Sequence, residues 1–291
     1  MRQRVLCGVG PMIAALACGF TAAAQAGAIQ RTEHSVPRSA GAPASAVEYE
    51  FDSRRMRLRV LPTVALKPNA NSASTSGISV REAATLPNVR ALMRSEMLLV
   101  NGGFSSSSTQ RSAGLLISDG RAVSLPEFGV RRGDPANACG ALRAERLRLS
   151  ALLCVDAAGS VQVGPMSNAD LDRCQQALQA GPLLLGKDGK ADMCPAPAAE
   201  REYLRTVLCT RDTLVKVIVV LQPVSLYDLA QWLAKPPSAQ GPGCTAAMNL
   251  SGDTSTGAVY SAGGKQSAAR GPDFAAAGSF PQASLLLISP R

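Results

Sequence analysis

Two polar turns, each following an apolar run, contain the side chains best suited to chemistry. The first turn is Asn101-Gly102-Gly103, at the end of the segment EMLLVNGGF. The amide of Asn101 can donate and accept hydrogen bonds, and Gly102 and Gly103 let a ligand approach the backbone. A sugar hydroxyl or phosphate oxygen would suit this turn. A plain turn with Asn at a positive φ angle would have the same sequence.

The second turn has the sequence NLSGDTS and covers residues 249–255. Asp253 is its only carboxylate and therefore its candidate acid or base. Asn249 supplies a second amide for a sugar or an oxyanion. The alternative is again a plain turn between two strands.

Arg205 lies in the segment LRTVLC, whose alternating pattern predicts a strand. A guanidinium fork matches the paired oxygens of a phosphodiester, so we expect Arg205 to bind phosphate. An ordinary strand arginine, exposed or paired with a carboxylate, is the alternative. The segment QAGPLLLGKDGK contains Gly181-Pro182, which has the form of a helix stop.

These four segments resemble, in this order and spacing, the phosphodiester glycosidase family. Members of that family carry an Asn-Gly-Gly-Phe-Phe turn, an Ala-Gly-Pro segment, an arginine-led strand and a final Asn-Leu-Asp-Gly-Gly-Gly-Ser turn. The resemblance covers roughly residues 100 to 260. It implies hydrolysis of a sugar-1-phosphodiester, with a sugar-phosphate diester or an envelope glycopolymer as the partner.

The last turn departs from the family pattern, because Ser251 replaces the family aspartate and Asp253 replaces a glycine. Cleavage of a glycosidic bond needs a group that activates water or attacks carbon, and a second that stabilises the leaving group. Asp253 is therefore the expected substitute acid. A catalytically impaired homologue that binds carbohydrate or phosphate in the cell envelope is the alternative.

The resemblance divides the candidate site residues into two groups. The predicted catalytic residues are Asp253 and Asn101. The predicted substrate-binding residues are Gly102, Gly103, Arg205, Asn249, Gly252 and Ser255.

The chain has one histidine, His34, in a weakly patterned leader. Serine and cysteine hydrolases of the familiar kind need an imidazole to take the proton of the nucleophile. We expect the leader not to hold His34 in place for that role, so those mechanisms are excluded. Acid-base chemistry must then come from carboxylates, tyrosine, lysine or water.

Residues 1–26 have the features of an export signal. Arg2 and Arg4 precede an uncharged apolar run, and the sequence AQA at 24–26 has the form that signal peptidase cleaves. We predict cleavage after Ala26 and a periplasmic or secreted protein. A lipoprotein anchored at Cys18 is the alternative. The apolar run is too short to span a bilayer, so we expect no stable membrane span after cleavage.

The cysteine pattern predicts disulfides rather than a metal site. Six of the eight cysteines follow the signal: Cys139, Cys154, Cys174, Cys194, Cys209 and Cys244. An even number in an exported chain predicts up to three disulfides and leaves the pairing open. There is no C-x-x-C pair, so we expect no zinc-type site and name no metal ligand or cofactor.

The chain is basic, and the densest basic group is RRMRLRV at 54–60. Its arginines alternate with apolar residues, as on a strand with one solvated face. Aromatic residues form only 4% of the chain and no recognition motif accompanies the arginines, so we expect no nucleic-acid partner.

The order of the segments predicts a single α+β domain over 47–291, after a flexible linker over 27–46. Its expected sheet is mixed and largely antiparallel, with a tight turn at Asp119-Gly120. Two main helices are expected. The first follows Ser167 and ends at Gly181, and the second covers 225–235 with Ser225 as its cap.

Overall fold

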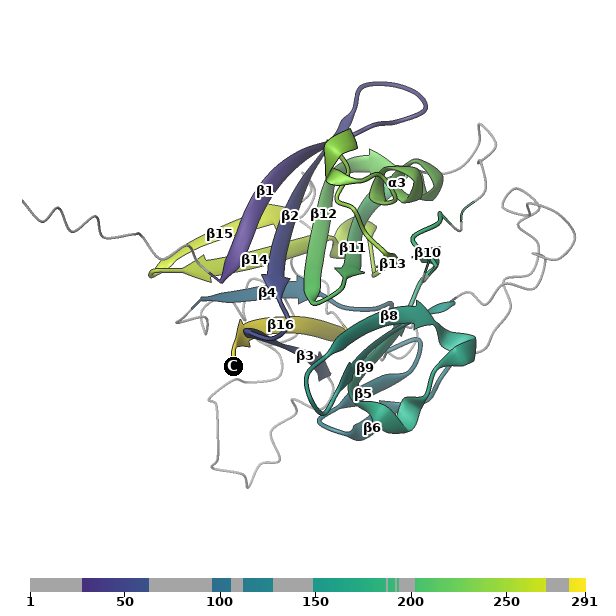
Figure 1. Ribbon diagram of the computed structural model, residues 1–291, viewed down its shortest axis with the longest axis vertical. Helices are drawn as coiled ribbons and strands as arrows, with labels where there is room; N and C mark the ends of the chain where they lie inside the picture. The colour runs from purple at the N-terminus through teal and green to yellow at the C-terminus, as the bar shows by residue number, and fades with distance from the viewer. Residues whose placement is uncertain are drawn as a thin grey trace, which may run out of the picture.

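The computed structural model describes residues 28–62, 96–105, 112–127, 149–186, 188–191, 193, 202–270 and 283–291. In these residues the chain forms three antiparallel sheets and one α-helix (Figure 1). The fold is therefore mainly β. The expectation of largely antiparallel strands is confirmed, and the expectation of two main helices is wrong.

The first sheet has the order β1-β2-β12-β11-β13-β10. Its strands are β1 (Ile29–Val36), β2 (Ala44–Asp52), β10 (Leu183–Leu185), β11 (Tyr203–Arg211), β12 (Leu214–Val224) and β13 (Ala246–Asn249). The second sheet has the order β15-β14-β4-β16-β3. Its strands are β3 (Met56–Pro62), β4 (Met97–Asn101), β14 (Gly257–Ala262), β15 (Lys265–Arg270) and β16 (Ser284–Pro290).

The third sheet has the order β6-β5-β9-β7-β8. Its strands are β5 (Leu116–Ser118), β6 (Arg121–Ser124), β7 (Ala151–Asp156), β8 (Val161–Pro165) and β9 (Cys174–Ala180). The helix is α3 (Leu226–Leu233), and short 3₁₀ turns are η3 (Met166–Asn168), η4 (Leu171–Arg173), η5 (Pro237–Ala239) and η6 (Asp253–Ser255).

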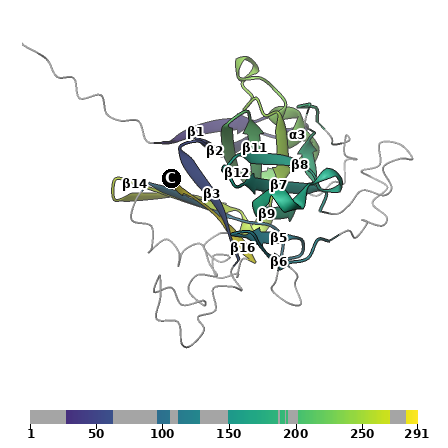
Figure 2. The ribbon, with the colours of Figure 1, turned by 60° about the horizontal axis from the view of Figure 1, so that its bottom comes forward.

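One cluster of buried apolar side chains is shared by all three sheets. The sheets lie next to one another in the turned view of Figure 2. It includes Phe51 from the first sheet, Val100 from the second and Leu153 from the third. The other face of the first sheet is covered by α3, whose Trp232 is 1% exposed. Burial on both faces fits the run VKVIVV in β12, in which apolar residues do not alternate with polar ones.

The prediction of a helix capped at Ser225 is confirmed. The Ser225 hydroxyl accepts a hydrogen bond from the backbone nitrogen of Asp228 at 3.0 Å. This contact satisfies one of the donors that a helix start leaves unpaired. Leu229 and Leu233 are buried against the sheet, as the spacing predicted.

The prediction of a helix after Ser167 is wrong. The segment forms η3, η4 and then strand β9 between β5 and β7. Cys174, which lies within the predicted helix, starts strand β9 and forms a disulfide with Cys154 of β7. Partners distant in sequence therefore override the local helical pattern.

The side-chain hydrogen bonds of Gln179 give the clearest physical reason why this segment forms strand β9 and not a helix. Its side chain is 1% exposed, and its Oε1 accepts from the backbone nitrogens of Leu115 and Glu127 at 2.9 Å each. Its Nε2 donates to the carbonyls of Glu127 at 2.6 Å and Leu149 at 2.9 Å. One glutamine thus satisfies four backbone groups outside its own strand.

The predicted flexible linker over 27–46 is also corrected, because it contains β1 and the start of β2. β1 pairs with β2 along its whole length, from Ile29 opposite Phe51 to Val36 opposite Ala44. Most side chains of β1 are exposed, since it is an edge strand. An exposed edge strand has no apolar alternation, so its sequence resembles a linker.

The described residues also include the predicted tight turn and four of the six cysteines that follow the predicted signal. The tight turn is confirmed, with φ angles of 49° at Asp119 and 73° at Gly120. Two disulfides are present, Cys154–Cys174 and Cys209–Cys244. Cys139, Cys194 and the export signal lie outside the described residues.

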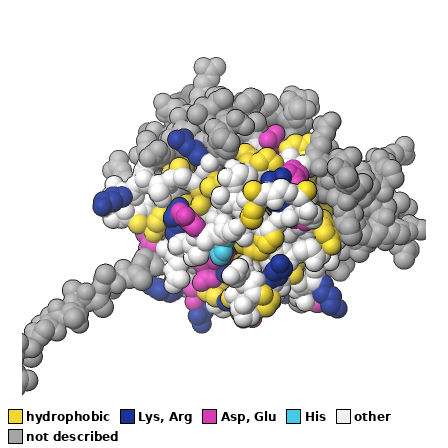
Figure 3. All heavy atoms as spheres, turned by 90° about the horizontal axis from the view of Figure 1, so that it is seen from above, with side chains coloured by type: hydrophobic (Ala, Val, Ile, Leu, Met, Phe, Trp, Pro, Cys, Tyr) yellow, Lys and Arg dark blue, Asp and Glu magenta, His cyan; other side chains and the backbone are white. Residues whose placement is uncertain are grey.

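The described residues offer neither a cluster of metal-binding side chains nor a helix able to cross a membrane. They contain no group of three or more His, Cys, Asp or Glu side chains placed to hold a metal ion. Among the same residues, no helix has the length and apolar character that crossing a bilayer requires. On the face shown in Figure 3, basic and acidic side chains are interspersed.

We predict that Gln179→Leu lowers the free energy of unfolding by about 4 kcal/mol. The change removes the partner of two buried backbone groups, those of Leu115 and Leu149, and each such group costs roughly 1–3 kcal/mol before relaxation. Chemical denaturation measures the loss. Gln175→Leu on the same strand is the matched control, because Gln175 is exposed and should change stability little. Equal effects of the two changes would contradict the role given to Gln179.

A buried ion cluster lies where β2 and β12 pair. Lys216 is 2.9 Å from Oε1 of Glu48 and 2.9 Å from Oε2 of Glu50. His34 of β1 places Nε2 3.3 Å from Oε2 of Glu48. Burial by itself raises the pKa of Glu48, but the contacts with His34 and Lys216 outweigh burial and hold that pKa below its usual value.

Lys216→Met should destabilise the protein at pH 7 by roughly 3–5 kcal/mol, because it removes the buried ammonium group that pairs with the buried carboxylate of Glu48. In the wild type, the lowered pKa of Glu48 stabilises the fold above about pH 4.5, and this stabilisation is lost on acidification. In the variant, the contact with His34 remains but that with Lys216 is lost, so the pKa of Glu48 lies higher than in the wild type and acidification relieves part of the defect. Unfolding curves should therefore show that the difference in free energy of unfolding between the wild type and Lys216→Met becomes smaller from pH 7 to pH 4.

The control for this experiment is Lys190→Met, since Lys190 pairs with Asp188 on the surface. It should leave stability nearly unchanged at both pH values. If the difference in free energy of unfolding between the wild type and Lys216→Met stays constant with pH, the pH dependence does not come from Glu48.

Candidate active site

The four segments singled out in the sequence meet in the structure. Asn249 at the end of β13 binds the Gly181-Pro182 segment twice: its backbone nitrogen donates to the Pro182 carbonyl, and its Nδ2 donates to the Gly181 carbonyl, both at 3.0 Å. The next nitrogen, of Leu250, donates to the Thr206 carbonyl at 2.8 Å. The turn after β13 thus lies between the Gly-Pro segment and β11.

The turn after β4, at residues 101–103, contacts the turn after β13. The nitrogen of Ser251 donates to the Gly102 carbonyl at 3.0 Å. In the reverse direction, Nδ2 of Asn101 donates to the Ser251 carbonyl at 2.7 Å. Residues 150 positions apart in sequence are therefore directly bonded, and the first and second sheets meet at this point.

Asn101 is fully buried, and its amide is used by the protein itself. Its Oδ1 accepts from the Thr206 hydroxyl at 2.7 Å and from the Gly257 nitrogen at 3.1 Å. With Nδ2 bound to Ser251, this side chain lies beneath the turns and holds them in position. The sequence predicts a catalytic role for Asn101, and in the structure both the oxygen and the nitrogen of its amide are hydrogen-bonded within the protein.

Gly102 and Gly103 are also buried, which changes the reason for their small size. A Cβ atom at Gly102 would lie 2.3 Å from Oγ and 2.6 Å from the carbonyl oxygen of Ser284. The nitrogen of Gly103 donates to the Ser284 hydroxyl at 3.1 Å. These glycines therefore permit close packing of the turn on β16, where the sequence predicted close approach of a ligand.

Arg205 lies near the start of β11 and is 9% exposed. Its guanidinium carbon is 5.1 Å from the centroid of the Tyr203 ring, a cation–π distance. The adjacent turn packs on this strand so closely that a Cβ at Gly252 would lie 2.6 Å from the Leu204 carbonyl. Arg205 and the second polar turn are thus neighbours.

Asp253 is the exposed carboxylate of the site. It begins η6 and has a φ angle of 55°, in the left-handed region that Asp tolerates better than most residues. The Thr256 nitrogen donates to its carbonyl at 2.9 Å, and the Ser255 nitrogen donates to Gly252 at 3.1 Å. In the described part of the chain, no hydrogen bond or ion pair involves its carboxylate. It can therefore face a solvent-borne ligand.

Of the two predicted site amides, Asn249 has hydrogen-bonding capacity left. Its Nδ2 is engaged, but its buried Oδ1 has no hydrogen-bond partner among the described residues. The hydroxyl of Thr256 is also buried and has no hydrogen-bond partner among the described residues. Buried polar atoms of this kind are uncommon and are often found in functional sites.

A cleft of about 400 Å³ lies elsewhere on the molecule. Its lining includes Arg57, Arg59, Asp119, Asp156, Gln176 and Arg291, and none of the predicted site residues. Gln176 is near the start of β9, whereas Ala180 at the end of that strand leads into Gly181. The cleft and the candidate site are thus at opposite ends of β9.

His34 is held more firmly than its sequence context predicted. It lies in β1, with its ring in edge contact with Trp232 at 5.4 Å between centroids. Its other described contact is Glu48. Neither neighbour belongs to the polar turns.

The three sheets, the buried Asn101 amide and the exposed polar turn define a mainly β protein in which the predicted site residues meet where strands of two sheets end. The family model for phosphodiester glycosidases matches residues 95–287. The chain therefore belongs to the phosphodiester glycosidase family. The match begins just before β4, so β1, β2 and β3 precede it.

Two solved structures share the fold. The zebrafish N-acetylglucosamine-1-phosphodiester alpha-N-acetylglucosaminidase catalytic domain, auto-inhibited by its pro-peptide, is 13% identical with a TM-score of 0.55, over 91% of this chain and 84% of that one. A hypothetical protein from Synechocystis is 15% identical with a TM-score of 0.54, over 91% of this chain and 62% of that one. No curated protein sequence matches the chain.

Three residues important to the site were missed in the sequence. Tyr203 could have been found from its alternation with Arg205, which places both on one side of a strand. Thr206 could have been noticed as a polar residue within an apolar strand. Ser284 gave no signal, because its contacts with Gly102 and Gly103 depend on the placement of β16.

We predict that Gly102→Ala destabilises the protein by about 2–3 kcal/mol and misplaces the polar turns. The new methyl group would overlap the backbone of Ser284, which cannot move as a side chain can. Gly164→Ala is the control, since a Cβ there meets nothing within 4 Å. Thermal unfolding of both variants checks this, and a harmless Gly102→Ala would contradict the packing role.

Proposed function

We propose that this protein is an exported hydrolase that releases a sugar from a sugar-1-phosphodiester. The observation that carries the proposal is the convergence of the two polar turns, Gly181-Pro182 and Arg205 at one place. Family membership supports the reaction type. The sugar-phosphate diester or envelope glycopolymer remains the proposed partner.

Asp253 is the proposed carboxylate of the reaction. It is exposed and lies on the turn next to the arginine-bearing strand. A carboxylate at this place can take a proton from water or stabilise positive charge at the sugar carbon. Gly252 and Ser255 are partly exposed on the same turn and complete its ligand-facing surface.

Arg205 is the proposed phosphate ligand. Its guanidinium group lies over the ring of Tyr203, and a guanidinium fork can make two parallel hydrogen bonds to phosphate oxygens. Asn249 and Asn101 hold the two turns in register beneath it. We assign Asn101 a positioning role in this reaction.

A second function, binding without turnover, is favoured by Ser251. This residue stands where the family turn has aspartate, and it is 8% exposed with its nitrogen bound to Gly102. A neutral hydroxyl therefore lies where the family places an acid. Asp253, two residues later, is displaced from it, and a small displacement of a catalytic group can lower a rate about a hundredfold.

The test is sugar release from an N-acetylglucosamine-1-phosphodiester by the purified mature protein. We expect Asp253→Asn to lower kcat at least about 100-fold, as loss of a general acid or base does. Asp212→Asn is the matched control, because Asp212 is also an exposed aspartate in a turn, with a φ angle of 54°. It lies at the other end of β11 and should leave kcat unchanged.

Two outcomes would overturn parts of this proposal. Full activity in Asp253→Asn removes Asp253 from the reaction. Binding of the diester by the wild type without any release of sugar supports the binding function, and Ser251→Asp should then restore measurable turnover.

A further inference from the structure

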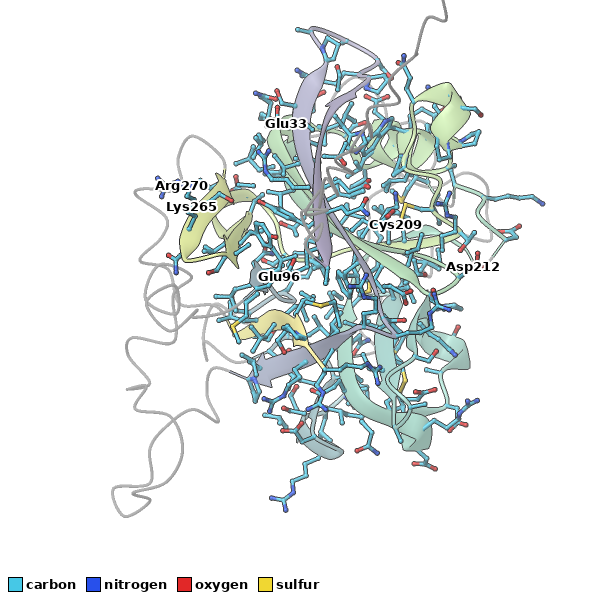
Figure 4. All side chains as sticks on the ribbon, turned by 60° about the vertical axis from the view of Figure 1, so that its left-hand side comes forward. Glu33, Glu96, Cys209, Asp212, Lys265 and Arg270 are labelled. Carbon is cyan, nitrogen blue, oxygen red and sulfur yellow. A yellow bond between two sulfur atoms is a disulfide. The ribbon has the colours of Figure 1, made fainter. Side chains whose placement is uncertain are left out.

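The cleft of about 400 Å³ lies where β3 of the second sheet meets the third sheet. Val60 of β3 joins the two sheets: its nitrogen donates to Oε1 of Gln176 at 3.0 Å, and its carbonyl accepts from the Ser118 hydroxyl at 2.8 Å. Figure 4 shows β3 beside the strands of the third sheet, which are drawn in teal. The buried side chains of Leu58 and Val155 also line the cleft. A volume of this size is typical of small-molecule sites.

One wall of the cleft is a hydrogen-bonded chain that the protein completes by itself. Nε2 of the buried Gln176 donates to Oδ1 of Asp119 at 2.8 Å, and Nη2 of Arg59 donates to Oδ2 of the same carboxylate at 2.9 Å. Partial burial raises the pKa of Asp119, but these contacts and the charge of Arg57 outweigh burial and hold that pKa below its usual value. Arg59 and Asp119 therefore neutralise each other on this wall.

Arg291 places a second guanidinium group on the cleft and holds it with backbone carbonyls. Nε and Nη2 donate to the Ser53 carbonyl at 3.1 and 2.8 Å. Nη1 donates to the Ala158 carbonyl, and Nη2 donates also to the Gly159 carbonyl, both at 3.1 Å. Carbonyl groups satisfy N–H donors but carry no net charge. These contacts therefore fix the guanidinium group of Arg291 without neutralising it.

Three other groups on the cleft have hydrogen-bonding capacity left. Arg57 is exposed on the same side of β3 as Arg59, and no hydrogen bond or ion pair in the described part of the chain involves its side chain. The exposed amide of Gln175 is likewise without a partner among the described residues. Asp156 uses Oδ1 to accept from the Ser160 nitrogen at 2.9 Å, which leaves its second oxygen for a ligand.

These three groups define a ligand by its chemistry. A guanidinium fork matches a carboxylate or phosphate group. An amide donates and accepts hydrogen bonds and a carboxylate accepts them, so both can bind hydroxyl groups. The residues that line the cleft include no aromatic one, so a flat apolar ligand would find no ring to stack on. A hydroxylated molecule with one acidic group fits this lining.

We propose that the cleft is a second binding site and that its ligand is an acidic sugar unit of a saccharide. Arg57 binds the carboxylate or phosphate group, and Gln175 and Asp156 bind hydroxyl groups. The charged side chains on the cleft carry an excess of one positive charge, which favours an anion. The cleft and the candidate active site lie at opposite ends of β9, so binding here does not depend on the reaction proposed above.

The experiment titrates the purified protein with three probes and follows binding by NMR. Trigalacturonic acid carries carboxylates, glucose 1-phosphate carries a phosphate, and maltotriose is neutral. We expect an acidic probe to bind at least about 10-fold more tightly than maltotriose, because it adds a charge-assisted hydrogen bond. The tighter of the two acidic probes identifies the acidic group. The backbone amides of Leu58, Val155 and Gly159 should shift on binding, since these residues line the cleft.

Three results of the titration would overturn the proposal. The first is that neither acidic probe binds. The second is that maltotriose binds as tightly as the acidic probes, because Arg57 would then have no part in recognition. The third is that the shifts are confined to the polar turns, which would place the acidic sugar in the candidate active site.

Arg57→Gln tests the residue on which the proposal depends. It should weaken binding of the acidic probe at least about 10-fold, as loss of a hydrogen bond to a charged group does. Arg55→Gln is the matched control, because Arg55 is an exposed arginine two residues earlier and does not line the cleft. It removes the same charge and should leave affinity nearly unchanged. Equal losses in the two variants would reduce the effect to net charge and overturn the assignment of the site.

Discussion

The hydrogen bonds of the Asn101 amide are the interaction on which the arrangement of this protein depends. One buried side chain joins the Thr206 hydroxyl, the Ser251 carbonyl and the Gly257 nitrogen, which belong to three separate segments. Each buried polar group must find a partner or carry a large desolvation cost. The amide therefore fixes the positions of all three segments relative to one another. The exposed turn that contains Ser251 and Asp253 is held in place by the same hydrogen bonds.

Several elements could be predicted from the sequence because their signals are local. The Ser225 cap and the Asp119-Gly120 turn use residues adjacent in the chain, and both were found. The sequence of β9 predicts a helix, because its strand conformation depends on Gln179 and Cys174, whose partners are distant in sequence. β1 was missed because an exposed edge strand carries little apolar pattern.

The candidate site was predictable in location and less so in the roles of its residues. Type and spacing identified Asn101, Arg205, Asn249 and the turn that contains Asp253, and the structure brings these segments together. Burial separates their roles, since Asn101 and Gly102 face the interior while Asp253 faces solvent. Periodicity within one segment does not reveal which side of a turn another sheet will cover.

The position of β16 has a consequence for how the molecule is made. This last strand lies between β4 and β3, in the interior of the second sheet. Until β16 has been synthesised and has left the ribosome, β4 and β3 each present an unpaired edge, and such edges are prone to pairing with other chains. Completion of the second sheet must therefore wait for β16, so factors that keep nascent chains apart should matter more for the yield of folded protein than for its final stability.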